Sequence, residues 1–218
     1  MVAAVEDLDG HIRGIHRTFL EVDPNGKVQK ADVDTPKKSL GFIKSCAVHL
    51  SDDYSEVLHL AEGIETGLAV LEAIGGSVWS TLSAKNLPAV VVPETVEEIF
   101  IWADKDRSGT GEKFAKIAAE HFIQQGKKAY FVMPEAEIPS DQKSMDWLDM
   151  GRTEIVSAMA TATEFVSVPT GMPWGTVIMP KRYSIGALGV FHEKDKADGE
   201  IQQVPVSTGA VWLSGSRV

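Results

Sequence analysis

The sequence predicts an α/β fold in which helices flank a parallel sheet. Short apolar segments of strand length alternate with segments of helical periodicity over residues 56–165, and this alternation is typical of strands joined by right-handed crossovers. With 218 residues, of which 44% are apolar and 24% charged, the chain has enough material to bury a core without disulfides.

The first part of the chain, residues 1–55, is expected to form an antiparallel N-terminal extension. Two β-like runs, at 11–22 and 46–52, are separated by polar sequence. Asn25 and Gly26 between them form a dipeptide that favours a hairpin turn. We therefore expect a small meander ahead of the main sheet.

Residues 56–165 are expected to form the catalytic domain. Within 108–126 the apolar residues share one helical face and Gly126 closes the segment. Trp79, Trp102 and Trp147 are expected in the core or in a pocket wall. Strands are predicted at 57–63, 98–106 and 128–134, and helices at 65–75, 108–126 and 144–162.

The last part, residues 166–218, reads as a linker followed by a β arm. Its first stretch is rich in Pro and Gly, as linkers are. The remainder predicts a hairpin that turns around 196–200. Because a lone hairpin is only marginally stable, we expect this arm to dock through apolar contacts, or to begin a following helicase-type domain.

Composition excludes several classes of protein. A single cysteine, Cys46, rules out an internal disulfide and a cysteine-based zinc site. No leader sequence and no apolar run of membrane-spanning length is recognisable, so we expect a cytoplasmic protein without a membrane partner. The net charge of −10 argues against a broad basic surface for nucleic acid. Bound metal ions can invert the local charge where acids cluster.

Acidic residues follow two of the predicted strands. Glu62 ends the first strand, with Glu65 three positions later, and Asp104 and Asp106 end the strand at 98–106. The carboxyl ends of parallel strands meet at one edge of a sheet, so these acids are expected to converge there. Oxygen-only ligands of this kind suit Mg²⁺ or Mn²⁺ rather than zinc.

The two runs VLHLAEGIETGLAV and IFIWADKDRSGTGEKFA closely resemble the Toprim domain, the metal-binding core of bacterial-type primases, of type IA and II topoisomerases and of certain nucleases. The family pattern is a strand ending in Glu-Gly, an acid three positions after the Glu, and a strand ending in Asp-x-Asp before a small residue and Gly. Glu62, Glu65, Asp104 and Asp106 match it. Asp146 and Asp149 resemble a third acidic position. The implied fold is a Toprim-like, Rossmann-like parallel sheet.

The resemblance is greatest to the primase part of primase-helicases from phages, plasmids and integrative elements. It implies that Glu62 acts as general base or shared ligand, that Asp104 and Asp106 bind Mg²⁺ or Mn²⁺, and that two metals activate a 3′-hydroxyl against a nucleotide. It also implies a single-stranded DNA template, nucleotides and a helicase domain or protein as partners. Candidate phosphate contacts are Lys85, Lys105, Arg107 and Lys113.

Two parts of a complete primase-helicase are missing from these residues. One cysteine cannot build a zinc module for template recognition. Gly26-Lys27 and Gly126-Lys127 lack the glycine that a nucleotide-binding loop needs five residues earlier. We therefore expect a primase module of a larger machine, one that primes poorly by itself.

Two alternatives use the same residues. One is a Toprim-type nuclease, and the other is a metal-stabilised platform that binds nucleic acid or a helicase without catalysis. A haloacid dehalogenase-type phosphatase also uses Asp-x-Asp, with Asp104 as nucleophile, but it leaves Glu62 without a role. A calcium-binding EF-hand loop would need Glu at the position of Ala115. Acids at strand ends can also be helix caps, with Ser108 as the cap of the next helix.

Overall fold

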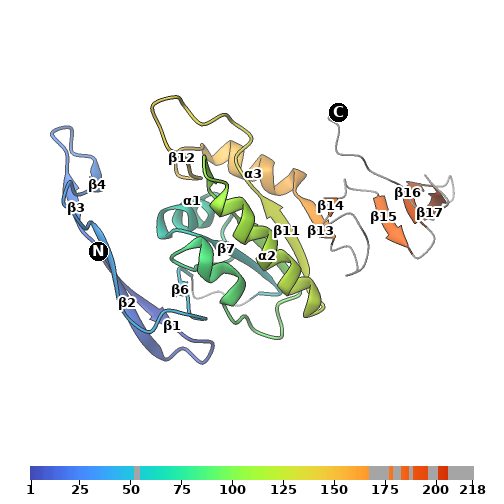
Figure 1. Cartoon of the computed structure of the whole chain (residues 1–218), viewed down its shortest axis with the longest axis horizontal. Helices are drawn as coiled ribbons and strands as arrows, with labels where there is room; N and C mark the ends of the chain where they lie inside the picture. Colours follow the sequence, from blue (N-terminus) through green and yellow to red (C-terminus); the bar gives the residue numbers. More distant parts are fainter. Residues whose placement is uncertain (52–54, 167–176, 179–182, 187–188, 196–200, 206–218) are drawn as a thin grey trace. The chain divides into compact units, whose positions relative to one another are not determined.

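The structure is a computed structural model that divides into two compact units, Met1–Ala162 and Thr163–Val218 (Figure 1). Among the described residues, no helix is long and apolar enough to cross a membrane. The described residues are 1–51, 55–166, 177–178, 183–186, 189–195 and 201–205.

The chain begins with a three-stranded antiparallel sheet, the N-terminal sheet, shown in blue in Figure 1. Its strands lie in the order β1, β2, β5, with β2 in the centre. The predicted turn at Asn25-Gly26 connects β3 to β4, which pair as a separate hairpin. Gly26 in this turn has a φ of +85°. The strand bounds are β1 Val2–Glu6, β2 Ile12–Thr18, β3 Leu20–Val22, β4 Val28–Lys30 and β5 Lys37–Gly41.

The central sheet of the first unit confirms the predicted parallel arrangement. Its strands lie in the order β11, β9, β7, β8, β6. The first four are parallel, and β6 pairs antiparallel with β8 at the edge. The run at 46–52 thus adds a strand to the central sheet. The bounds are β6 Val48–His49, β7 Val57–Ala61, β8 Ser77–Ser80, β9 Glu98–Trp102 and β11 Lys128–Val132.

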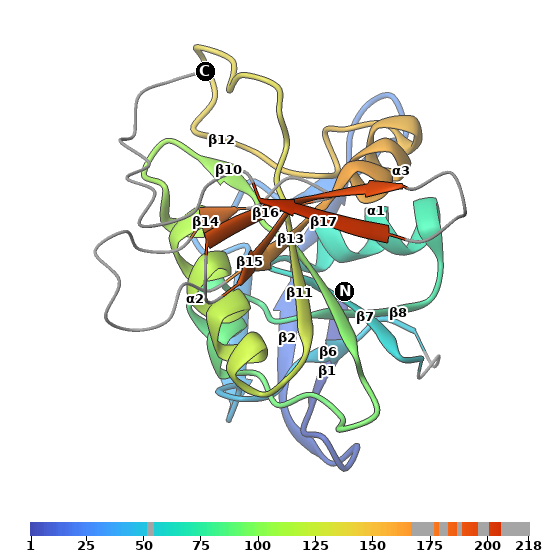
Figure 2. The same cartoon turned by 90° about the vertical axis from the view of Figure 1, so that its right-hand side faces the viewer.

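Helices cover both faces of the central sheet. Figure 2 shows α1 and α3 on one side and α2 on the other. Buried side chains of the strands pack against helices on both sides, because neighbouring side chains on a strand point to opposite faces of the sheet. Phe100 and Trp102 pack with α1 and α3. The bounds are α1 Ile64–Ile74, the 3₁₀ helix η1 Ala84–Ala89, α2 Thr110–Gln124 and α3 Arg152–Thr161.

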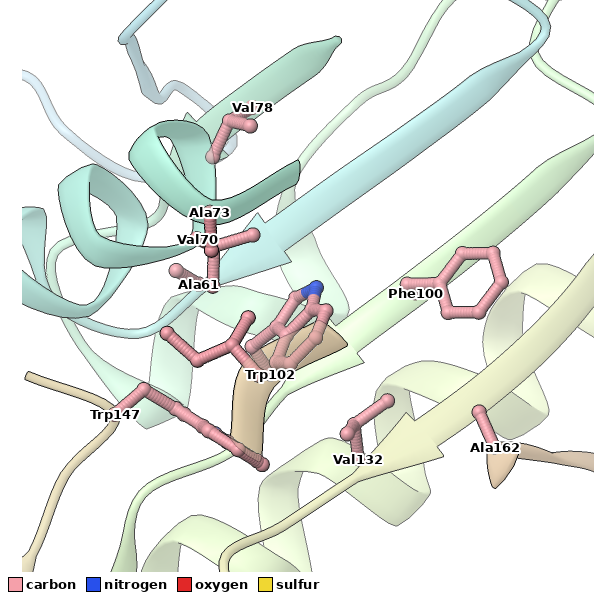
Figure 3. Close-up of a cluster of buried hydrophobic side chains, with 10 residues drawn as sticks. Ala61, Val70, Ala73, Val78, Phe100, Trp102, Val132, Trp147 and Ala162 are labelled. Atoms are coloured by element: carbon pink, nitrogen blue, oxygen red, sulfur yellow. The ribbon is translucent and has the colours of Figure 1, made fainter. Parts of the chain in front are cut away.

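Two tryptophans hold the end of β9 in place within the core (Figure 3). The Trp102 and Trp147 rings lie edge to face at 4.9 Å. Trp147 Nε1 donates a buried hydrogen bond of 3.1 Å to the carbonyl oxygen of Ala103. Trp102 Nε1 donates one of 3.1 Å to His59 Nδ1. The backbone just before Asp104 is therefore fixed by packing and by a hydrogen bond.

The predicted helix at 144–162 is wrong in its first half, because α3 begins only at Arg152. Ser144–Met145 instead forms the short strand β12, antiparallel to β10 at Lys105–Asp106. The Asp146 carboxylate accepts the backbone N–H of Leu148 at 3.0 Å, which is an Asx turn. Such a bond competes with helical hydrogen bonding.

The second unit contains short antiparallel strands. β13 Thr163–Val166 pairs with β14 Val177–Ile178. β15 Tyr183–Gly186, β16 Gly189–Asp195 and β17 Ile201–Pro205 form a three-stranded sheet. The predicted pairing on either side of 196–200 is present, although the turn itself lies outside the described residues. Docking of the arm stays a prediction.

Candidate functional site

A cavity of about 530 Å³ opens where β7 and β9 end and α2 begins. Glu62 directly follows β7, Asp104 follows β9, and Asp106 lies in β10. These three predicted acids line the same cavity, because their strands are parallel neighbours. The residues that line it are Glu62, Asp104, Asp106, Arg107, Ser108, Thr110, Lys143 and Ser144.

Asp104 is the most perturbed acid of the cavity. Burial raises the pKa of its carboxyl to about 7, and the negative charges of Glu62 and Asp146 raise it too. A hydrogen bond opposes this rise, since Thr66 Oγ1 donates to Asp104 Oδ1 at 2.8 Å. Thr66 lies in the first turn of α1 and is only 1% exposed. Asp104 thus sits close to its ionisation midpoint at neutral pH.

Glu62 shares this electrostatic environment. Burial raises the pKa of Glu62, and the charge of Asp106 adds to the rise. The backbone N–H of Ala84, the first residue of η1, donates to the Glu62 carboxylate and partly offsets the effect. A carboxyl group with a raised pKa is well suited to accept a proton near neutral pH.

Asp106 points toward the start of α2. Its Oδ1 accepts the hydroxyl and the N–H of Ser108 and the N–H of Thr110, and its Oδ2 accepts the N–H of Gly111 at 2.8 Å. Burial opposes ionisation, but these hydrogen bonds outweigh it and lower the pKa of Asp106. The expected cap, Ser108, is not the N-cap of α2; Gly109 holds that position, and Asp106 accepts the first N–H groups.

Two glycines permit this close approach. Gly109 has a φ of +69°, a left-handed conformation that side chains disfavour. At Gly111 a Cβ atom would collide with the carbonyl oxygen of Asp104. The Ser-Gly-Thr-Gly sequence therefore lets the N-terminus of α2 contact the Asp-x-Asp segment.

Lys105 and Arg107 hold the loop between β11 and β12. Lys105 Nζ donates to the carbonyl oxygens of Glu135 and Ala136, the latter at 2.7 Å. Arg107 donates to three further loop carbonyls, including that of Pro139 at 2.8 Å. Of the four candidate phosphate contacts, only Arg107 lines the cavity, while Lys85 and Lys113 are exposed and do not.

Asp146 lies near the cavity but does not line it. Its charge raises the pKa of Asp104. Burial, and then the charge of Asp149, raise the pKa of Asp146 itself. Asp149 Oδ2 accepts the Asp146 N–H at 3.3 Å, so the two acids form one turn. The third acidic position is thus electrostatically coupled to the site through Asp146.

Glu65 points to a different neighbour. Its carboxylate forms an ion pair of 2.7 Å with Lys37 Nζ, from the first residue of β5 in the N-terminal sheet. Lys37 was not predicted, because a contact across 28 residues leaves no local pattern in the sequence. Thr66, Lys143 and Ser144 were also missed. The position of Thr66 directly after the predicted Glu65 could have indicated that it lies near the site.

The carboxylates fit a hard divalent cation. They offer only oxygen ligands, which Mg²⁺ and Mn²⁺ prefer. Burial, and then the charges of Glu62 and Asp146, raise the pKa of Asp104 to about 7, so a bound cation would favour its ionised form. Asp106 Oδ2 accepts one hydrogen bond and has a second lone pair available.

The three carboxylates are too widely spaced to bind one ion without movement. Within the part of the chain that the structure describes, the ligand atoms of Glu62, Asp104 and Asp106 do not all lie within 4.8 Å of one another. One ion bound by all three therefore requires at least one of these side chains to move.

A second cluster lies at the turn between β1 and β2. Among the described residues it alone brings at least three metal-ligating side chains, Asp7, Asp9 and His11, within 4.8 Å of one another. Asp7 Oδ1 accepts the N–H groups of Asp9 and His11 at 3.1 and 3.0 Å, and Arg13 lies 3.8 Å from Asp7 Oδ2. Turn hydrogen bonds and a cation therefore already account for this cluster.

Comparisons with known proteins identify two segments. Residues 57–154 match the Toprim domain family, and residues 1–50 match a family described as a domain of unknown function (DUF7146). No curated protein matches the chain. The Toprim match covers Glu62, Asp104, Asp106 and Asp146.

Several solved primase structures resemble this chain at low sequence identity. The DnaG primase catalytic domain bound to ssDNA has 16% identity and a TM-score of 0.48, with 74% of this chain and 51% of that chain covered. The E. coli primase catalytic core has 14% identity and a TM-score of 0.47, with 74% and 51% covered. The bacteriophage T7 lagging-strand polymerase complex with gp4 primase domains has 20% identity and a TM-score of 0.39, with 74% and 76% covered. The chain spans about half the length of the first two.

Proposed function

Since residues 57–154 match the Toprim domain family, we propose that the chain catalyses divalent-metal-dependent nucleotidyl or phosphoryl transfer on nucleic acid. The specific proposal is the primase module of a mobile-element replication protein. One observation carries it: Glu62, Asp104 and Asp106, from the ends of two adjacent parallel strands, line one cavity within this domain. The match to the Toprim family supports a nucleic-acid-related and metal-dependent function.

Asp104 and Asp106 are metal ligands in this proposal, with Asp106 contributing its Oδ2 lone pair, and Glu62 is a shared ligand or general base. A bound Mg²⁺ or Mn²⁺ would supply Lewis-acid stabilisation of charge on a phosphate. Glu62, whose pKa is raised by burial, is the candidate proton acceptor. Arg107 and Lys143 place positive charge on the rim of the same cavity, where a phosphate would lie.

The geometry disfavours two of the alternative functions. A haloacid dehalogenase-type phosphatase would use Asp104 as nucleophile and leave Glu62, which lines the same cavity, without a role. In an EF-hand the place of Ala115 would belong to a ligand, yet Ala115 is fully buried in α2. A Toprim-type nuclease remains the alternative that uses the same residues and the same metal.

Single-stranded DNA template, nucleotides and a helicase domain or protein are the proposed partners. The charge distribution is compatible with a nucleic-acid partner at the N-terminal end. The first 50 residues contain seven of the 21 basic and seven of the 31 acidic residues, so the excess of negative charge lies after them. Charge repulsion from the remainder supports the expectation that the chain alone primes poorly.

The test is an incubation with labelled single-stranded DNA, ribonucleotides, deoxynucleotides and Mn²⁺ in which both new strands and cut template are scored. We expect weak, Mn²⁺-dependent strand synthesis that disappears in Glu62→Gln and in Asp104→Asn. Asp141→Asn, at an exposed acid of the loop before β12, is the matched control and should retain activity.

The products decide between the proposal and its alternatives. Cutting of the template without synthesis would identify a nuclease. No reaction by the wild type, together with measurable Mn²⁺ and DNA binding, would identify a non-catalytic platform. Efficient priming by the isolated chain would contradict the expectation that it depends on a larger machine.

A further inference from the structure

The N-terminal sheet contributes a positive charge to the neighbourhood of the acidic cavity. On β5, alternate residues face opposite sides of the sheet. Lys37 and Ser39 share the inner side, where Ser39 Oγ lies 2.8 Å from Nδ1 of the buried His16. Lys38 and Leu40 share the other side, and both are exposed. Only Lys37 of the adjacent lysines can therefore face α1.

Lys37 is fixed by Glu65 and acts on the cavity acids. The ion pair with Glu65 is 2.7 Å long, with the two side chains 36% and 29% exposed. Glu65 lies in the first turn of α1 beside Thr66, whose hydroxyl donates to Asp104 Oδ1 at 2.8 Å, so the ion pair holds Lys37 near the cavity acids. The charge of Lys37 also favours the ionised forms of these acids. Lys30 also acts on Glu65. Glu65 is thus occupied by cations of the N-terminal segment.

We propose that Lys37 is a counter-ion which the N-terminal sheet supplies to the Toprim site, and that it lowers the affinity of the site for divalent metal. A second consequence is that Glu65 anchors Lys37 and is not a metal ligand. In this proposal Lys37 acts on the site through its charge and is not a ligand. The inference rests on the proposed metal function and assigns a role to the segment of unknown function.

Lys37 and a divalent metal ion are cations that act on the same group of acids. Glu62, Asp104, Asp106 and Asp146 bring up to four negative charges together, and Lys37 offsets part of their repulsion when no metal is present. Once a divalent ion binds, the same ammonium group repels it. One unit charge that acts on a divalent ion through a solvent-like dielectric at a separation of about 6–12 Å corresponds to roughly a three- to tenfold change in affinity.

The experiment measures the Mn²⁺ dissociation constant of the full chain by electron paramagnetic resonance and by calorimetry. Lys37→Met removes the charge and keeps an unbranched side chain, and Lys37→Arg keeps the charge. Lys38→Met is the matched control. We expect Lys37→Met to bind Mn²⁺ about three to ten times more tightly, and the other two variants to stay within about twofold of the wild type.

The Glu65→Gln variant tests whether Glu65 anchors Lys37 or binds the metal. If Glu65 is an anchor, this variant should lose at most about tenfold in Mn²⁺ affinity, and the double variant with Lys37→Met should return near the wild-type affinity. A loss of about a hundredfold or more in Glu65→Gln would make Glu65 a ligand and overturn the inference. So would an unchanged or weakened affinity in Lys37→Met. If the wild type binds no Mn²⁺, the proposed function fails first, and this inference fails with it.

Discussion

Asp104→Asn should stabilise the metal-free protein at neutral and alkaline pH, although it removes a proposed metal ligand. Above neutral pH, ionised Asp104 is held in a buried position near the charges of Glu62 and Asp146. Asparagine has a similar shape, carries no charge and can still accept the hydrogen bond from Thr66 Oγ1. The substitution therefore relieves desolvation and repulsion without creating a cavity.

The size of this effect follows from the pKa of Asp104. Its folded-state value of about 7 lies above the reference value of 3.8. Between these values the folded protein holds a proton that the unfolded chain has lost, so stability falls as pH rises through this window. Three pKa units correspond to about 4 kcal/mol above pH 7, an upper limit because nearby water screens the charge. The advantage of Asp104→Asn should grow by about 2 kcal/mol between pH 5.5 and pH 8.

Urea unfolding in EDTA at these two pH values measures the difference directly. Asp141→Asn, at an exposed position, is the control and should show no comparable dependence on pH. Added Mg²⁺ should reduce the advantage of Asp104→Asn, because only the wild type retains the full metal site. An Asp104→Asn variant that is less stable than the wild type at pH 8 would refute the reasoning.

Four further predictions concern the residues around the cavity and the C-terminal arm. Gly111→Ala should lower the urea unfolding free energy by about 2 kcal/mol or more, because its Cβ meets the Asp104 carbonyl; a neutral effect would contradict this. Trp147→Phe should cost about 1–3 kcal/mol in the same assay, since it leaves the Ala103 carbonyl unpaired; an unchanged midpoint would show that water replaces the bond. Arg107→Ala should speed proteolysis within 133–143, with Arg107→Lys intermediate, and equal rates would argue against its loop contacts. Truncation after Phe165 should leave Mn²⁺ binding intact, and loss of binding would make the arm integral to the catalytic domain.

Sequence reasoning located the parts of the fold that depend on local periodicity. The parallel strands, α1 and α2 follow from apolar spacing, and the convergence of Glu62 with Asp104 follows from adjacent parallel strands that end at one edge. It failed at the predicted start of the last helix. Met145 and Leu148, like Trp147 and Met150, are three residues apart, which is compatible with a helix. The Asp146 side chain instead accepts the N–H of Leu148, and the helix begins only at Arg152.

Features that depend on long-range contacts could not be predicted in this way. Lys105 and Arg107 look like free cations beside an acidic motif, yet both donate to carbonyl groups about 30 residues away. The pairing of Lys37 with Glu65 requires the N-terminal sheet to contact α1, which no periodicity encodes. The direction of Asp106 depends on Gly109 and Gly111, whose conformations are visible only in the structure.

A crystal structure of the full chain soaked in Mn²⁺, with anomalous diffraction recorded at the manganese edge, tests directly whether this cavity binds metal. We expect an anomalous peak in the cavity within about 2.3 Å of oxygen atoms of Asp104 and Glu62. The peak should be absent in Asp104→Asn. Manganese bound only at the Asp7, Asp9 and His11 turn, or no ordered manganese at all, would contradict the assignment of this cavity as the metal site.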